Sequence, residues 1–66
     1  MPIIRVDGPK VADLDKKRQF VKEVTKAAST LYGLPEKIIV VLLQENSADN
    51  VASGGQLICD LHKSDS

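Results

Sequence analysis

The sequence predicts a small α/β (α+β) fold: a β-α-β unit with two parallel strands, one crossover helix and a short C-terminal hairpin or arm. Three observations predict it. The chain opens with an extended run rich in β-branched residues, continues with a long amphipathic segment, and then contains six consecutive apolar residues. A strand on each side of one helix favours a right-handed crossover between parallel strands. All 66 residues should form a single domain, because a chain of this length has room for only one.

The first strand is expected at about residues 2–7. Ile3, Ile4 and Val6 are β-branched and favour an extended backbone. Asp7-Gly8-Pro9 then favours a turn, because glycine adopts positive φ at little cost and proline fixes φ. We therefore expect the strand to end near the aspartate.

The crossover helix is expected at about residues 14–32. Asp13 is a good N-cap residue, Gly33 suits the position after the helix, and Pro35 prevents continuation. At about 100° per residue, apolar side chains collect on one arc, and polar and charged residues fill the rest. The apolar arc contains Phe20, Val21, Val24, Ala27, Ala28 and Leu31.

Lys17 projects towards this apolar arc, near the start of the helix. Two interpretations are open. In the first, which we favour, its methylene groups cover the edge of the core while the ammonium group reaches water. In the second, Lys17 points into a site at that end of the sheet and contacts an anionic substrate.

The second strand is expected at about residues 38–45. Its six apolar residues have no polar break, which is typical of a strand buried on both faces. One helix covers only one face of a two-stranded sheet, and no further helix is expected. Another copy of the chain should therefore cover the second face, and we expect an obligate homo-oligomer. The uncovered residues are Ile39, Val41 and Leu43 if the helix meets Ile38, Val40 and Leu42.

The remainder should contain a loop and a short C-terminal strand within residues 46–61, followed by a tail at 62–66. Gly54-Gly55 suits the corner of a tight hairpin. Residues 56–61 form either a short third strand or an arm on a neighbouring subunit.

Composition excludes several classes of function. Nine basic and nine acidic residues cancel, which does not favour binding to nucleic acid or to an anionic membrane. The longest apolar run is six residues, far below the roughly 20 that cross a bilayer, so we expect no membrane association and a cytoplasmic protein. Cys59 and His62 are the only residues of their types, so neither a disulfide nor a zinc site is expected, and we expect no cofactor. We expect the Cys59 thiol to be buried and the His62 imidazole to be solvated.

Pro2 is the candidate catalytic residue. If Met1 is removed, Pro2 carries a secondary amine instead of an amide nitrogen, and a main-chain amine titrates near roughly 8. The strand that follows would hold this amine in a fixed position, as a general base requires. The structural alternative is that Pro2 only starts a strand, a position at which proline is tolerated.

The layout resembles the 4-oxalocrotonate tautomerase family over nearly the whole chain. The resemblance implies that the initiator methionine is removed and that the proline nitrogen shuttles a proton between carbons of an enol or unsaturated keto acid. It also implies a homo-oligomer, usually a hexamer built as a trimer of dimers. The residues that carry the resemblance are Met1-Pro2-Ile3, Gly33-Leu34-Pro35, Glu45, Asn50 and Gly54-Gly55.

The substrate-binding residues differ from those of the best-known family members. Those members have an arginine in the connector before the helix, a second arginine in the middle of the second strand, and an aromatic residue before the glycines. Here Lys10, Val40 and Val51 stand at these places. The resemblance implies that Lys10 contacts an anionic group as a point charge and that Val51 forms part of the pocket wall. Arg5 is the other candidate cation, although strand alternation could place it on the far face.

These differences favour a smaller enol over a dicarboxylated dienol as the substrate. The competing hypothesis is a noncatalytic oligomeric β-α-β assembly module that has lost or changed the tautomerase activity.

Overall fold

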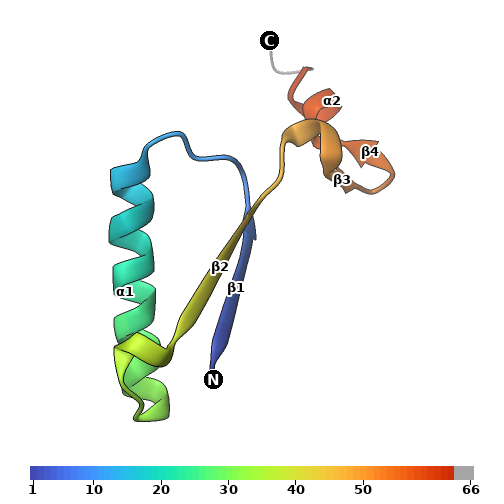
Figure 1. The fold of residues 1–66 in the computed structure, drawn as a ribbon. Helices are drawn as coiled ribbons and strands as arrows, with labels where there is room; N and C mark the ends of the chain where they lie inside the picture. The colour runs from blue at the N-terminus through green and yellow to red at the C-terminus, as the bar shows by residue number, and fades with distance from the viewer. Residues whose placement is uncertain (64–66) are drawn as a thin grey trace.

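The computed structural model describes residues 1–63 and consists of a β-α-β unit followed by a small C-terminal lobe (Figure 1). The predicted fold class is confirmed, because a helix connects two parallel strands and a short antiparallel hairpin follows them. The elements are β1 (Ile3–Gly8), α1 (Leu14–Tyr32), the 3-10 helix η1 (Glu36–Ile38), β2 (Val40–Glu45), the 3-10 helix η2 (Ala48–Asn50), β3 (Ala52–Ser53), β4 (Gln56–Leu57) and α2 (Ile58–Lys63).

β1 and β2 form a two-stranded parallel sheet in which Ile3 pairs with Val40 and Gly8 pairs with Glu45. β1 ends at Gly8, slightly beyond the predicted end. The reason is that the Gly8 carbonyl accepts a hydrogen bond from the Asn46 N–H at 2.9 Å and so continues the ladder into the turn region.

β2 begins at Val40, later than the predicted start at residue 38. The Pro35 carbonyl accepts a hydrogen bond from the Ile38 N–H at 3.3 Å, and the next carbonyl accepts one from the Ile39 N–H at 3.1 Å. These two residues are therefore engaged in the η1 turn and its exit, and their N–H groups are not available to the sheet.

α1 spans Leu14–Tyr32, the same range that the sequence predicts. The Asp13 side chain accepts hydrogen bonds from two N–H groups of the first turn. Gly33 ends the helix with φ 66°, a left-handed conformation, and donates its N–H to the Ser29 carbonyl at 2.9 Å. Within residues 1–63, no helix combines the length and the apolar character needed to cross a bilayer.

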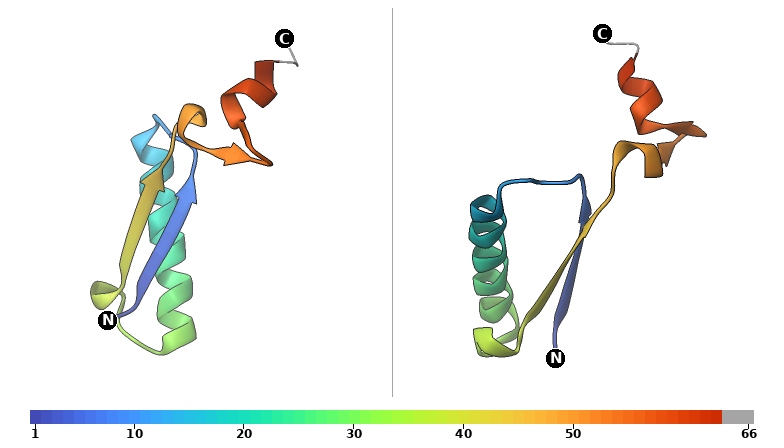
Figure 2. Two further views of the ribbon diagram at one scale, coloured as in Figure 1. Left: turned by 90° about the vertical axis from the view of Figure 1, so that its right-hand side faces the viewer. Right: turned by 45° about the horizontal axis from the view of Figure 1, so that its top comes forward.

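α1 covers one face of the sheet and leaves the other face bare (Figure 2). Val6 of β1 and Leu43 of β2 line a pocket together with Phe20 of α1, so these strand positions face the helix. Because side chains alternate along a strand, Val41 joins them, and Leu42 lies on the bare face. The arrangement in which Leu42 meets the helix is therefore wrong. The register with β1 places Val41 beside Ile4 and Leu43 beside Val6 on the face that α1 covers.

The core of a single chain is thin. Among residues 1–61, Ala28 alone is buried, with 7% of its surface exposed. Three members of the predicted apolar arc are not covered, since Leu31 is 75% exposed and Phe20 and Ala27 are also exposed. A sheet of two strands contacts only a narrow stripe of a helix, and that stripe is displaced from the predicted arc. Its buried and half-buried members are Lys17, Val21, Val24, Thr25, Ala28 and Ser29.

The C-terminal lobe consists of η2, β3, β4 and α2. Gly54 and Gly55, with φ 60° and 82°, form the hairpin corner that the sequence predicts, because glycine accepts successive positive φ angles without strain. The strand expected within residues 56–61 is limited to β4, because β3 offers it only two residues for pairing. The chain then turns back into α2, where the Ile58 N–H donates to the Val51 carbonyl at 2.7 Å.

The predicted tail at 62–66 also differs from the structure at its beginning. The backbone of residues 62 and 63 belongs to α2, whereas residues 64–66 and the His62 side chain lie outside what the structure describes. Cys59, expected to be buried, is half-buried.

Candidate functional site

Pro2 lies at the amino-terminal end of the sheet, directly before β1. Its carbonyl accepts a hydrogen bond from the Val40 N–H at 3.0 Å, so its backbone is tied to the first residue of β2. Pro2 is half-buried, and Met1 before it is exposed. While Met1 is attached, the Pro2 nitrogen is an amide and has no basic lone pair. Removal of Met1 leaves a secondary amine at a fixed point of the sheet.

Lys10 and Val51 lie beyond the opposite end of the sheet from Pro2. Lys10 is in the connector of residues 9–13 between β1 and α1, and Val51 directly follows η2 (Figure 1). A strand of six residues spans about 20 Å at roughly 3.3 Å per residue. One protomer therefore does not bring Pro2 together with either of these predicted partners.

Arg5 lies in the middle of β1, where it pairs with Leu42. In β1, Ile4 and Val6 are half-buried on the helix side, and Arg5 is exposed between them. It therefore projects from the bare face of the sheet, which is the far-face position that strand alternation allowed for this residue.

Val51 lines a pocket of about 350 Å³ at the carboxyl-terminal end of β1. Its wall is mainly apolar and includes Pro9, which precedes Lys10 along the chain, and Ile58 from α2. The described structure thus places Val51 in a pocket wall and the Lys10 backbone next to that pocket.

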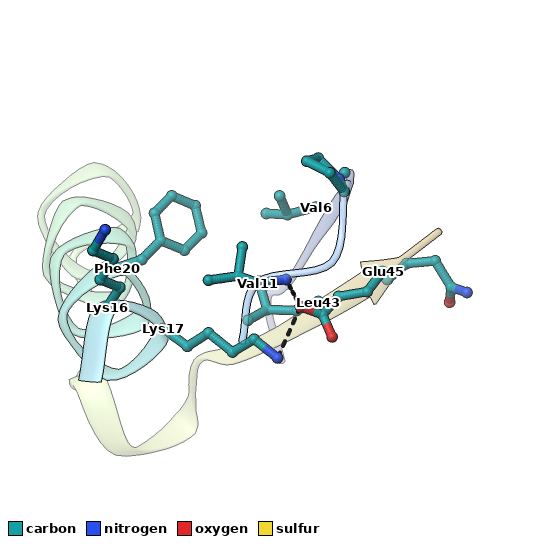
Figure 3. A pocket seen from close by; sticks show the side chains of 10 residues that line it. Val6, Val11, Lys16, Lys17, Phe20, Leu43 and Glu45 are labelled. Atoms are coloured by element: carbon teal, nitrogen blue, oxygen red, sulfur yellow. Dashed lines mark hydrogen bonds and ion pairs between the residues drawn. The ribbon is translucent and has the colours of Figure 1, made fainter. Parts of the chain in front are cut away.

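A second pocket, of about 320 Å³, opens between the first half of α1, the connector and the end of β2 (Figure 3). Glu45 lies at its rim. One oxygen, Oε2, accepts the Val11 N–H at 2.7 Å and the Lys17 ammonium at 2.8 Å. The Lys17 and Glu45 side chains are 25% and 28% exposed, so the pair is partly shielded from water.

The environment of Glu45 stabilises its ionised form. The hydrogen bond from Lys17 is the main cause that lowers the pKa of the carboxyl below its ordinary value, and the Val11 N–H adds to it. Partial desolvation acts in the opposite direction, and the charge of Lys10 adds a smaller favourable contribution. Glu45 is therefore a carboxylate at neutral pH.

Lys17 follows neither interpretation fully. Its stem lines the apolar pocket, as the first interpretation expects, but its ammonium group is paired with Glu45 instead of being free for water or substrate. The sequence held a usable signal for this pair. In a β-α-β unit, the carboxyl end of the second strand and the start of the helix lie at the same edge of the sheet, so opposite charges at these two places can meet.

Comparison with known proteins places these features in a family context. The family model described as "Tautomerase enzyme" matches residues 2–61. A protein of Bacillus cereus named "Probable tautomerase" is 33% identical over 60 residues, which cover 91% of this chain and 98% of that protein.

Two solved structures have the same fold and appreciable sequence identity. The crystal structure of DmpI from Archaeoglobus fulgidus is 44% identical, with a TM-score of 0.80, and the match covers 89% of this chain and all of that one. The crystal structure of a 4-oxalocrotonate tautomerase homologue is 35% identical, with a TM-score of 0.82, covering 91% of this chain and 95% of that one.

Proposed function

Because this chain belongs to the tautomerase family, we propose that it is an isomerase that moves a proton within an enol or unsaturated keto acid. Pro2, freed by removal of Met1, is the general base and then the general acid. The observation that carries this proposal is the anchoring of Pro2. The Pro2 carbonyl accepts a hydrogen bond from the Val40 N–H, so the Pro2 nitrogen has a defined position at the edge of the sheet.

The reaction needs one group that alternates between two protonation states. The neutral proline amine takes a proton from one position of the substrate, and the resulting ammonium returns a proton to another position, so the amine is regenerated. A secondary amine that titrates near roughly 8 serves both steps when its surroundings lower its pKa towards neutrality. Apolar neighbours and a nearby cation both act in this direction.

The remaining site residues serve binding. In this proposal the Lys10 ammonium contacts the carboxylate of the substrate, Val51 forms part of the apolar wall, and Arg5 is a further cation. Since Pro2 lies about 20 Å from the connector within one chain, a complete site combines Pro2 of one copy with Lys10 and Val51 of another. A homo-oligomer, with the family's hexamer as the expected form, follows from this requirement.

The substrate class follows from lysine, at position 10, as the contact for the substrate carboxylate. A lysine binds one carboxylate as a point charge and lacks the planar fork with which arginine holds carboxylates in two contacts. A monoanionic enol such as phenylenolpyruvate should therefore react faster than the dianionic 2-hydroxymuconate.

Two measurements test the function. The intact mass of the purified chain shows whether Met1 has been removed. Ketonisation of phenylenolpyruvate is then compared for the wild type, Pro2→Ala and the matched control Pro35→Ala, which changes a proline whose nitrogen is an amide within the chain. We expect Pro2→Ala to lower kcat/KM by ~100-fold, in the range of general acid–base catalysis, and Pro35→Ala to retain activity.

The opposite results have defined meanings. A mature chain that retains Met1 has no basic nitrogen at Pro2, and equal rates for the wild type and Pro2→Ala would remove Pro2 from the mechanism. Intact assembly without turnover would favour the noncatalytic assembly module.

A further inference from the structure

Glu45 joins three segments that are distant in the sequence. It is the last residue of β2, it accepts the Val11 N–H of the connector at 2.7 Å, and it pairs with Lys17 of α1 at 2.8 Å. Figure 3 shows both interactions converging on its carboxylate at the rim of the pocket. A single side chain thus ties the connector to the sheet and to the helix.

The connector has few other attachments to the sheet. Pro9 has no N–H to donate. For residues 9–12, the bond from Val11 to Glu45 is the one hydrogen bond to another segment within the described part of the chain. Lys10 directly precedes Val11, so the position of its backbone depends on this bond.

The pairing of Glu45 with Lys17 also affects Lys10. Lys10 is close enough to Glu45 to favour its ionised form, yet within residues 1–63 the carboxylate forms its ion pair with Lys17. Since Lys17 neutralises the carboxylate, the Lys10 ammonium is left for an anion from outside the protomer.

We propose that Glu45 is a positioning residue: it clamps the connector through Val11, is itself held by Lys17, and so fixes Lys10 for contact with the substrate carboxylate. This inference rests on the proposed function, in which Lys10 is the anion contact. Glu45 acts through Lys10 and does not touch the reacting atoms.

Three variants separate the two interactions of Glu45. Glu45→Leu removes both the acceptor and the charge. Glu45→Gln keeps an acceptor for the Val11 N–H but loses the charge, and Lys17→Met keeps the acceptor while removing the partner. The control is Glu23→Gln, which changes an exposed carboxylate on α1 that accepts a hydrogen bond from Gln19 of its own helix.

The clamp is measured first, without reference to activity. Hydrogen exchange of the Val11 amide, followed by NMR, should be ~10-fold or more faster in Glu45→Leu than in the wild type. Glu45→Gln and Glu23→Gln should leave it slow. Exchange of Val11 at the same rate in the wild type and Glu45→Leu would overturn the clamp, whether or not the protein is a tautomerase.

Kinetics then test the link to Lys10. With phenylenolpyruvate, we expect Glu45→Leu and Lys10→Ala each to raise KM ~10-fold while kcat changes less than about threefold. Both variants weaken the contact with the substrate carboxylate but leave the Pro2 base in place. Glu45→Gln should restore most of the affinity. The double variant should be no worse than Lys10→Ala alone, since both changes remove the same contact.

The outcomes distinguish the two proposals. If the KM effects of Lys10→Ala and Glu45→Leu multiply, Glu45 does not act through Lys10 and the positioning role is wrong. If Pro2→Ala retains full activity, the proposed function fails, whereas the exchange at Val11 still decides whether the clamp exists. Should Glu45→Leu fail to fold, Lys17→Met takes its place in both comparisons, because it releases the carboxylate that holds the Val11 N–H: faster exchange at Val11 and a raised KM are expected, and unchanged values would overturn the clamp.

Discussion

Glu45 illustrates how much one side chain depends on groups far along the sequence. Its carboxylate meets the Val11 N–H, which is 34 positions away, and the Lys17 ammonium on the helix. Both contacts favour the charged form and lower the pKa of the carboxyl, and they do so at a site that water still reaches. Protonation of this one group therefore removes the ion pair that ties the end of β2 to the start of α1.

The pH dependence of stability should follow from this pKa. A carboxyl whose pKa is lower in the folded state than its ordinary value of 4.5 stabilises the fold fully above that value, and the contribution disappears as the pH falls through the lower folded value. We expect the wild type to melt at a higher temperature than Glu45→Gln at pH 7, and the difference to shrink at pH 3. Thermal unfolding followed by circular dichroism measures both.

Salt provides the internal control for this measurement. Because the Lys17 and Glu45 side chains are about one-quarter exposed, added salt should reduce the difference in melting temperature between the wild type and Glu45→Gln at pH 7 without abolishing it. A difference in melting temperature that is the same at pH 7 and pH 3 would show that the charge of Glu45 does not contribute.

α1 is the element whose limits are specified most locally. Asp13 caps its first turn with its own side chain, and Gly33 ends it with a left-handed backbone that returns an N–H to Ser29. Pro35 then forces an extended conformation before η1. Each of these signals operates within a few residues, so the helix ends where it does regardless of what it packs against.

Gly33→Ala should test the helix end. A Cβ at this position meets no other atom within 4 Å, so the only cost is that of holding a non-glycine residue at φ 66°. We expect the free energy of unfolding to fall by about 1–2 kcal/mol, measured by urea denaturation.

The matched control for this change is Gly8→Ala. Gly8 also has open space around its Cβ position, but its φ is not in the left-handed region, so the substitution should be nearly neutral. Equal losses at Gly33 and Gly8 would mean that backbone strain at the helix end is not the cause.

The single chain is too extended to be a self-sufficient globule. Its radius of gyration is 15.6 Å, against about 11 Å expected for a compact domain of 66 residues. The bare face of the sheet carries Leu42, 43% exposed, and α1 exposes Phe20 and Leu31. We propose that other copies of the chain cover this apolar surface.

Assembly can be tested on the bare face. Sedimentation of the wild type should give a species well above the mass of one chain. Leu42→Lys, which places a second cation opposite Arg5 in the ladder, should dissociate that species or weaken it strongly, because it would bury a charge between copies.

Thr30→Lys is the control for this variant, since Thr30 is an exposed polar residue of α1 and should tolerate a lysine. A wild-type chain that sediments as a folded monomer would contradict the argument from the bare face, and an unchanged assembly in Leu42→Lys would move the interface elsewhere.

Local chemistry in the sequence was sufficient for the β-α-β unit, the limits of α1 and the glycine corner at Gly54-Gly55. These features depend on capping groups, on proline and glycine and on apolar runs, whose effects extend over only a few residues. Pro2 was also visible locally as a candidate base, because removal of Met1 would give this residue a secondary amine.

The tertiary structure decided what depends on distant partners. Register with β1 selected Val41 and Leu43, and not Leu42, for the helix face. The shortness of β3 limited the expected C-terminal strand to β4, and the chain continues as α2. It also paired Lys17 with Glu45 and separated Pro2 from Lys10 by the length of the sheet. Such relations arise from strand pairing and crossover geometry, which join residues dozens of positions apart and leave no mark in any short stretch of sequence.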